Sequence, residues 1–309
     1  MSKGSLFWGN ASGKLGESVF YRAKGEQRNR TYVKNIANPR TEAQAVNRIS
    51  MANFSSVFRA FKDLLRVSFP NKAVNQSGFN AFVKENKTAS SPALPKSGLE
   101  AGLFVARDMV MSKGSIAHPS ALKLHPIPSE GENDACLGYM FSVLDYTGNA
   151  AFDALFAEVG EGANHVVLNT PEMIGHAFDL LGLPSDAVIT IPYALYADEG
   201  YEGGTIKVTR EGVVSDTELV QFCMCFAYQD GTAPAPNAIF IGAYSTGYTD
   251  EVMSALIISY KIEGKVQVTT SRMLPMGSAM DFSNQFYAGG DLYQEVLAEY
   301  APTAESVLV

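Results

Sequence analysis

The hydrophobic pattern of this chain changes its period between the first third and the remainder. Over residues 41–67, apolar side chains recur at the spacing of one face of an α-helix. From Cys136 onward, short runs rich in β-branched and aromatic residues alternate with turn residues. The pattern predicts an α+β fold, mainly β. An N-terminal hairpin and a long amphipathic helix precede an antiparallel β-sandwich-like body with a few helices.

The predicted long helix begins at a capping-box pattern. Asn38-Pro39 interrupts the chain, and Thr41 and Gln44 are the residue types that satisfy the first free amides of a helix. Continued to Val67, this helix is roughly 39 Å long. It is too long to pack on a hairpin alone, so its apolar face must meet another domain or another subunit. That face consists of Val46, Ile49, Phe54, Val57, Phe58, Phe61, Leu64 and Leu65.

Two further features follow the long helix. Residues 77–83 predict a second, short helix that brings Phe79, Phe82 and Val83 together and packs on the first. Residues 88–98 are rich in Ser and Pro, which is typical of a protease-accessible linker or an extended crossing segment.

The N-terminal hairpin is predicted from runs 18–22 and 30–33, which flank a turn containing Gly25. Its basic residues are interleaved with Phe20, Tyr21 and Tyr32, a combination that suits phosphate contact and base stacking. Exposed hairpins also carry Lys and Arg to prevent edge-to-edge aggregation, so the sequence leaves both interpretations open.

A basic stripe lies opposite the apolar face of the long helix. Such a stripe is usually a solvated face. The alternative is docking against phosphates or an acidic protein, for which the acidic half of this same chain is a candidate. The nine residues of the hairpin and helix that we predict to bind a partner are Lys14, Arg22, Lys24, Arg28, Arg30, Arg48, Arg59, Lys62 and Arg66.

The remainder of the chain predicts a β-rich body. Its strand-like runs are 137–144, 187–196, 205–209, 220–228, 238–244, 255–262 and 265–273. Glu263-Gly264 is typical of a tight hairpin turn. A helix is predicted to start at Thr170-Pro171 and to end at Gly182, and another covers residues 291–300.

Charge is divided by position along the chain. Residues 1–124 contain 19 Lys+Arg and 7 Asp+Glu, whereas residues 125–309 contain 5 and 25. This division predicts a basic hairpin and helix arm (1–98), a connecting segment (99–135) and an acidic β-rich body (136–309), with different partners.

No set of residues predicts a reaction. The four histidines lack the spacing of a zinc site, and no complete P-loop or Gly-x-Ser-x-Gly elbow occurs. Cys136, Cys223 and Cys225 are too few for a disulfide scaffold, and the latter two fit core positions better than soft-metal ligands. We therefore expect no enzymatic activity, no cofactor and no metal.

The chain also lacks a signal-peptide pattern and an apolar run of ~18 to 20 residues, so we expect a soluble protein without a membrane partner.

Four short motifs carry a resemblance to a known family. They are Gly13-Lys14-Leu15-Gly16, Asn38-Pro39-Arg40-Thr41, Asn75-Gln76-Ser77-Gly78-Phe79-Asn80 and Ser112-Lys113-Gly114-Ser115. Over roughly the first 120 residues, the chain resembles an uncharacterised protein family of Bacteroidetes and their bacteriophages. The resemblance implies a Gly-Lys-x-Gly hairpin, a helix and a later β-rich region with a hairpin, which here matches residues 255–260 and 266–270. It implies a phage or prophage origin, and it supplies no activity, ligand or catalytic residue.

Three functions are compatible with these features. We expect a non-enzymatic virion structural or assembly protein that acts through subunit contacts, as a homo-oligomer or with other virion proteins. Its location would be the virion, or the host cytoplasm during assembly. The alternative is a nucleic-acid-binding protein that uses the basic N-terminal arm. An enzyme or carbohydrate-binding module in the β body has no positive signal, although sandwich folds host many sites that leave no motif.

Overall fold

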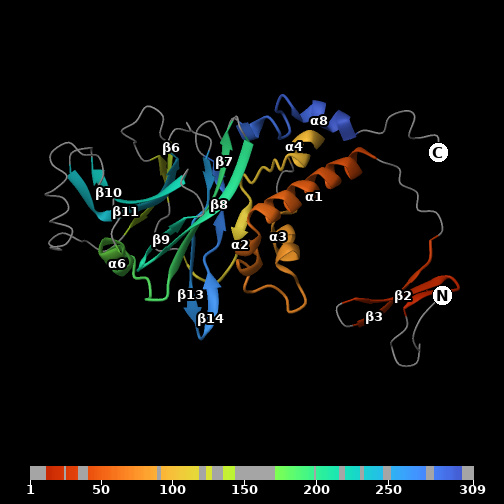
Figure 1. Ribbon diagram of the computed structural model, residues 1–309, viewed down its shortest axis with the longest axis horizontal. Helices are drawn as coiled ribbons and strands as arrows, with labels where there is room; N and C mark the ends of the chain where they lie inside the picture. The colour runs from red at the N-terminus through yellow and green to blue at the C-terminus, as the bar shows by residue number, and fades with distance from the viewer. Residues whose placement is uncertain are drawn as a thin grey trace. The chain divides into compact units, whose positions relative to one another are not determined.

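The computed structural model forms two compact units, each of which is described here by itself (Figure 1). It describes residues 12–23, 26–33, 41–88, 92–117, 123–126, 135–142, 171–197, 200–215, 220–229, 233–245, 252–275 and 282–300. One unit comprises Met1–Thr41, Ala73–Asn75 and Pro302–Val309, and the other comprises Glu42–Lys72 and Gln76–Ala301. The three predicted segments, 1–98, 99–135 and 136–309, were defined by charge and not by packing. Their boundaries at residues 98 and 135 remain a prediction.

The first unit contains a three-stranded antiparallel sheet. Its strands, in spatial order, are β1 (Gly13–Leu15), β2 (Ser18–Ala23) and β3 (Glu26–Thr31). The predicted hairpin is confirmed as β2 and β3. Strand β1 is an addition that the sequence did not reveal, because three residues are too few to show the alternation of a strand.

Four helices open the second unit. They are α1 (Glu42–Ala60), α2 (Lys62–Val67), α3 (Gly78–Asn86) and α4 (Lys96–Glu100). Helix α1 begins directly after Thr41, as predicted. The short helix α3 is also confirmed, with the Ser77 hydroxyl accepting a hydrogen bond from the Asn80 backbone N–H at 3.1 Å.

The prediction of one continuous helix over residues 41–67 is wrong in one respect. Phe61 separates α1 from α2, with φ −112° and ψ 32°. No proline or glycine lies nearby to cause this break, so we attribute it to packing. The Phe61 ring is buried and meets the Phe104 ring edge to face, with centroids 5.8 Å apart.

A mostly antiparallel sheet of seven strands forms the centre of the β body. Its strands are β7 (Val188–Ala197), β8 (Gly200–Thr209), β9 (Gly212–Ser215), β12 (Val252–Ser254), β13 (Ile257–Ile262), β14 (Lys265–Val268) and β16 (Leu274–Pro275). Strand β7 is central, because it pairs with β8 on one side and with both β12 and β13 on the other. The predicted tight turn is confirmed between β13 and β14, where Glu263 and Gly264 have φ of 51° and 76°.

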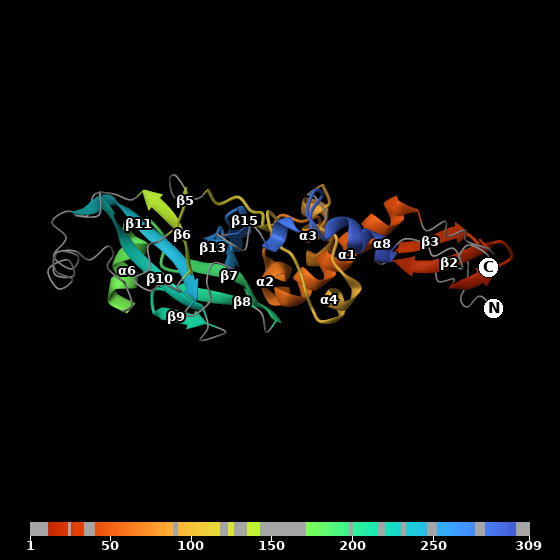
Figure 2. The same cartoon turned by 90° about the horizontal axis from the view of Figure 1, so that it is seen from above.

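The remaining strands form two smaller antiparallel sheets. One contains, in order, β10 (Val220–Gln229), β11 (Ala233–Ser245), β6 (Ala135–Ser142) and β5 (Lys123–Pro126), and the other pairs β4 (Val110–Ser112) with β15 (Ser271–Arg272). Strands β6 and β11 lie against β12 of the seven-stranded sheet. Figure 2 shows α1 to α4 on one side of these sheets, together with α8 (Tyr293–Tyr300). Helix α6 (Pro171–Leu180) is followed by Gly182 in a left-handed conformation with φ of 67°, as predicted for its C-terminal end. Helix α8 confirms the predicted final helix. The α+β, mainly β, fold class is therefore confirmed.

One hydrophobic core joins the helices to the sheet. Phe61 contacts Phe104, whose ring centroid lies 6.1 Å from that of Tyr196 on β7, and the Tyr196 hydroxyl donates to the Phe104 carbonyl at 3.0 Å. The apolar face of α1 and α2 thus meets the body of its own chain, which is the first of the two predicted alternatives. Members of this core from helices and strands include Phe54, Val57, Phe61, Leu65, Phe82, Phe104, Ala194, Tyr196, Met253 and Ile257.

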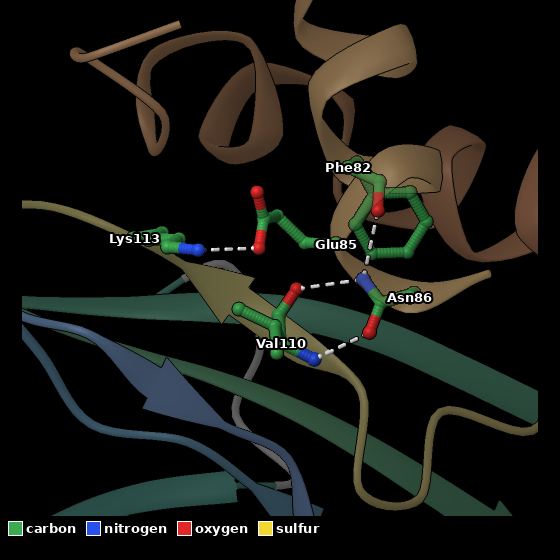
Figure 3. Close-up of polar contacts among 5 residues, drawn as sticks. All are labelled: Phe82, Glu85, Asn86, Val110 and Lys113. Carbon is green, nitrogen blue, oxygen red and sulfur yellow. Dashed lines mark hydrogen bonds and ion pairs between the residues drawn. The ribbon is translucent and has the colours of Figure 1, made fainter. Parts of the chain in front are cut away.

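Two buried asparagines attach Val105 and the first residue of β4, Val110, to the helices. The side-chain oxygen of Asn53, on α1, accepts a hydrogen bond from the Val105 N–H at 2.9 Å. The Asn53 side-chain NH2 donates a hydrogen bond to the Val105 carbonyl at 2.8 Å. Asn86 of α3 makes the same pair of bonds to Val110, at 2.7 and 3.0 Å, and its amide also donates to the Phe82 carbonyl at 3.0 Å (Figure 3). Each side chain satisfies two buried backbone groups as a neighbouring strand would, so neither helix can separate from this segment without cost.

The Ser112-Lys113-Gly114-Ser115 motif joins α2 and the β body. The Lys113 N–H donates to the Ser68 carbonyl at 3.0 Å, and the Ser112 hydroxyl donates to the Thr269 carbonyl at 2.7 Å. A Cβ atom on Gly114 would lie 2.0 Å from the Val268 carbonyl oxygen, so this close approach requires glycine. The motif therefore has a structural role in the packing of the chain.

Residues 88–98 were predicted to be an accessible linker or an extended crossing segment, and residues 92–95 fit the second alternative. Residues 92–94 are buried, the Ala93 N–H donates to the Phe286 carbonyl at 2.7 Å, and the Leu94 carbonyl accepts from the Tyr300 hydroxyl at 3.0 Å. Helix α4 follows directly. Two prolines and several serines resembled a linker, but the apolar Ala93 and Leu94 fill space between the helices and the C-terminal segment. Residues 89–91 lie outside the described residues.

Candidate interaction surfaces

Eight of the nine predicted basic residues lie in the described part of the chain, on three surfaces. Lys14, Arg28 and Arg30 share one face of the N-terminal sheet, whereas Arg22 lies on the opposite face by strand alternation. Lys24 lies outside the described residues. The other four are exposed on α1 and α2, as the helical pattern predicted. They are Arg48, Arg59, Lys62 and Arg66.

Strand register builds the first surface, which we call the tyrosine face. Lys14 pairs with Val19, which pairs with Arg30, and the next row on the same face pairs Tyr21 with Arg28. Tyr32 completes the face, because its ring lies under the Lys14 ammonium, with the Lys14 Nζ 3.6 Å from the ring centroid. The tyrosine face thus consists of Lys14, Val19, Tyr21, Arg28, Arg30 and Tyr32.

The tyrosine face presents cations beside accessible rings. Tyr21 and Tyr32 are each 40% exposed. Arg28 is in an exposed ion pair with Glu26 at 3.1 Å, an interaction that contributes little to stability and is easily exchanged. The Arg30 side chain makes no hydrogen bond or ion pair with any described residue. Rings and cations in this arrangement can stack on bases while contacting phosphates.

A groove between α2 and the seven-stranded sheet forms the second surface. It has a volume of about 700 Å³. Its helical wall runs from Arg59 to Ser68, and its floor is one face of β7, β8, β13 and β14. Two rows of cross-strand neighbours form part of this floor. They are Val188 with Ser259 and Val268, and Thr190 with Ile257 and Lys207. We call this feature the α2 groove.

The break at Phe61 and a glycine on β8 explain why the groove exists. Gly203 lets the C-terminal end of α1 approach β8 closely. A Cβ atom at this position would lie 3.2 Å from the Ala60 Cβ and 3.3 Å from the Phe61 ring. Beyond this contact, α2 does not cover the sheet. Val67 and Val266, on the two sides of the groove, are therefore 62% and 49% exposed.

Basic side chains surround this partly apolar floor. Arg59, Lys62 and Lys207 line the α2 groove, and Lys261 lies beside it, directly opposite Val266 in the register of β13 and β14. None of these four side chains forms an ion pair or a hydrogen bond with a described residue. Two acidic residues, Asp63 and Glu202, also line the groove. An incoming carboxylate would find several cations without having to displace an internal partner.

Sequence reasoning identified Arg59 and Lys62 but missed Lys207 and Lys261. A usable signal was present, because residues 125–309 contain only five Lys+Arg, and these are Lys207, Arg210, Lys261, Lys265 and Arg272. Three of the five belong to β8, β13 and β14, the strands of the groove floor. Arg210 lies elsewhere, in an ion pair with Asp179 at 2.6 Å that lowers the pKa of the Asp179 carboxyl through a hydrogen bond.

Neither a metal-binding cluster nor a membrane-spanning helix occurs in the described ranges. No three His, Cys, Asp or Glu side chains gather there as they would around a metal ion. No helix in these ranges combines the length and apolar character that a membrane span requires.

Comparison with known proteins connects part of the chain to a family. The model of a family of unknown function, DUF6266, matches residues 9–133. The match includes all nine predicted basic residues, the helices α1 to α4 and the buried asparagines. The floor of the α2 groove lies outside it. No curated protein and no solved structure matches the chain.

Proposed function

We propose that this chain is a non-enzymatic structural or assembly protein that acts through subunit contacts. The α2 groove of one copy would receive an acidic, partly apolar surface of a second copy. The single observation that supports this proposal is the set of groove cations whose side chains have no partner among the described residues. Residues 125–309 of every copy supply 25 Asp+Glu against 5 Lys+Arg, so a second copy has the complementary charge.

Such a contact joins two different surfaces, and it is therefore heterologous. A heterologous contact generates rings if it closes and filaments if it does not. The resemblance in the N-terminal motifs to a family found in bacteriophages supports a role in a virion. On this proposal the protein is located in the virion, or in the host cytoplasm during assembly.

Charge reversal on α2 tests the proposal. The variant Arg59→Glu with Lys62→Glu should shift nuclease-treated protein towards monomer in multi-angle light scattering at low salt, because like charges then meet across the interface. The unmodified protein should dissociate as salt rises, since exposed charges are screened over about 8 Å at physiological ionic strength.

The matched control is Lys84→Glu with Lys87→Glu on the exposed side of α3. It changes the net charge equally and has the same three-residue spacing, yet it lies away from the α2 groove and should leave the mass unchanged. A protein that is monomeric at every salt concentration, or equal loss of association in both double variants, would contradict the proposal.

The tyrosine face supports a second candidate function, binding of single-stranded nucleic acid. Its specific support is the pair of exposed rings beside Lys14 and Arg30. Each neutralised phosphate should add about 0.7 to the slope of log affinity against log salt. Tyr21→Ala should weaken binding of a fluorescent oligonucleotide, with Tyr293→Ala as the control. Binding that ignores salt, or that Tyr21→Ala leaves intact, would exclude this function.

A further inference from the structure

A second cavity in the larger unit contains two arginines. It has a volume of about 680 Å³, and Arg107, Asp108, Arg272, Asn284 and Tyr287 contribute to its lining. It does not share a lining residue with the α2 groove. Neither the charge pattern nor the motifs of the sequence pointed to it, because the two arginines are 165 positions apart in the chain.

Backbone pairing brings these two arginines together. The Asp108 N–H donates to the Met273 carbonyl at 2.9 Å, and the Met273 N–H donates to the Met109 carbonyl at 2.9 Å. These two bonds place the segment of Arg107 beside the segment of Arg272. Both guanidinium groups therefore project from a fixed, hydrogen-bonded pair of segments.

The two arginines differ in how they are held. Arg107 donates a hydrogen bond to the Asn284 side-chain oxygen, and its guanidinium carbon lies 5.5 Å from the Tyr287 ring centroid. The Arg107 Nε also lies 3.4 Å from an Asp108 carboxylate oxygen. The Arg272 side chain is exposed and forms no hydrogen bond or ion pair with any described residue. The cavity thus holds one oriented arginine and one that is available to a ligand.

The charge of the cavity favours an anion. Among the described residues that line the cavity, Arg107 and Arg272 are accompanied by a single carboxylate, that of Asp108. Burial raises the pKa of the Tyr287 hydroxyl, so this group is uncharged at neutral pH and adds no negative charge. Asp108 also has φ of 59°, a left-handed conformation that is uncommon for residues other than glycine and that tends to occur at binding sites.

We propose that this cavity binds a small molecule through a phosphate or carboxylate group held between Arg107 and Arg272. The planar guanidinium group can donate two parallel hydrogen bonds to either kind of oxyanion. The cavity volume is in the range of small-molecule sites and exceeds what a bare phosphate fills, so the ligand has a body beyond its anionic group. This inference is independent of the proposed assembly function.

Calorimetric titration tests the site with two probes, inorganic phosphate and malonate, at constant ionic strength set with sodium chloride. At least one probe should bind with a stoichiometry near one. Arg272→Gln should weaken that binding at least tenfold, because it removes the unpartnered cation. Binding of phosphate alone would identify a phosphoryl ligand, of malonate alone a carboxylate ligand, and of both a general oxyanion site.

The control variant is Arg66→Gln, which removes an exposed cation of α2 that lines neither cavity. It should bind the probe as the unmodified protein does. Arg107→Gln provides a second test if its circular dichroism spectrum is unchanged, and Arg272→Gln alone decides the outcome if it is not. Absence of binding by both probes, or equal weakening by Arg66→Gln and Arg272→Gln, would overturn the proposal.

Discussion

Asn86 of α3 offers the sharpest test of how this fold is held together. Its buried amide makes three hydrogen bonds, two of them with the backbone of Val110 at 2.7 and 3.0 Å (Figure 3). The substitution Asn86→Ala removes all three. It leaves the Val110 N–H and carbonyl without this partner at a position that is only 6% exposed.

The expected loss of stability follows from these two backbone groups. A buried polar group left without a partner costs about 1–3 kcal/mol. The higher helix propensity of alanine stabilises the folded protein by about 0.5 kcal/mol relative to asparagine. The free energy of unfolding should therefore fall by about 2–5 kcal/mol, out of a total that is typically about 5–15 kcal/mol for a protein.

Urea unfolding followed by far-ultraviolet circular dichroism measures this change. Asn80→Ala is the matched control, because Asn80 is an exposed asparagine of the same helix whose side chain forms no hydrogen bond with a described residue. That control should change stability by no more than about 0.5 kcal/mol. Hydrogen exchange adds a local readout, since the Val110 amide should lose protection in Asn86→Ala.

Two results would refute this reasoning. A loss below about 1 kcal/mol would mean that water or a neighbouring group replaces the amide without penalty. An equal loss in Asn86→Ala and Asn80→Ala would mean that the effect comes from helix α3 in general and not from the attachment of Val110.

Two further predictions concern backbone packing and pH. Gly114→Ala should lower the free energy of unfolding by about 3 kcal/mol, because the new Cβ meets the Val268 carbonyl, whereas Gly175→Ala on α6 has no atom within 4 Å and should be neutral or stabilising. Equal unfolding midpoints for Gly114→Ala and Gly175→Ala would contradict the prediction that Gly114 is required for close packing. Asp179→Asn should lower the melting temperature slightly above pH 5, because the folded protein holds the pKa of Asp179 below its usual 3.8. That contribution exists above the unfolded pKa and is lost as pH falls through the folded one, so the difference from the unmodified protein should vanish in strong acid. The Asp179 carboxylate is exposed, so the effect should stay below about 1 kcal/mol and shrink in high salt. A difference that persists at pH 2 would exclude this ion pair as its cause.

Local patterns predicted most elements of this fold. The capping signal at Thr41, the Glu263-Gly264 turn and the runs of β-branched residues all act over a few residues, so the sequence shows them directly. The break at Phe61 was not predictable in this way, because no local breaker causes it. It depends on contact with Phe104, which is 43 positions away.

The candidate surfaces also contain residues that local patterns predicted and residues that only the packing of distant segments brought together. The helical period placed Arg59 and Lys62 on the exposed side of their helix. Lys14 lies beside Arg30 only because strand register pairs both residues with Val19. Lys207 and Lys261 gave no periodic signal, and they reach the α2 groove only because β8 and β13 flank β7.

The sequence by itself determined the fold class, most helix and turn positions and the division of charge, because each depends on neighbouring residues or on counting. Tertiary structure alone decided that α1 and α2 pack on their own β body, that Asn86 holds Val110, and that Arg107 and Arg272 share a cavity. These outcomes depend on which distant segments pair, and pairing is set by the summed burial and hydrogen bonding of the whole chain rather than by any local pattern.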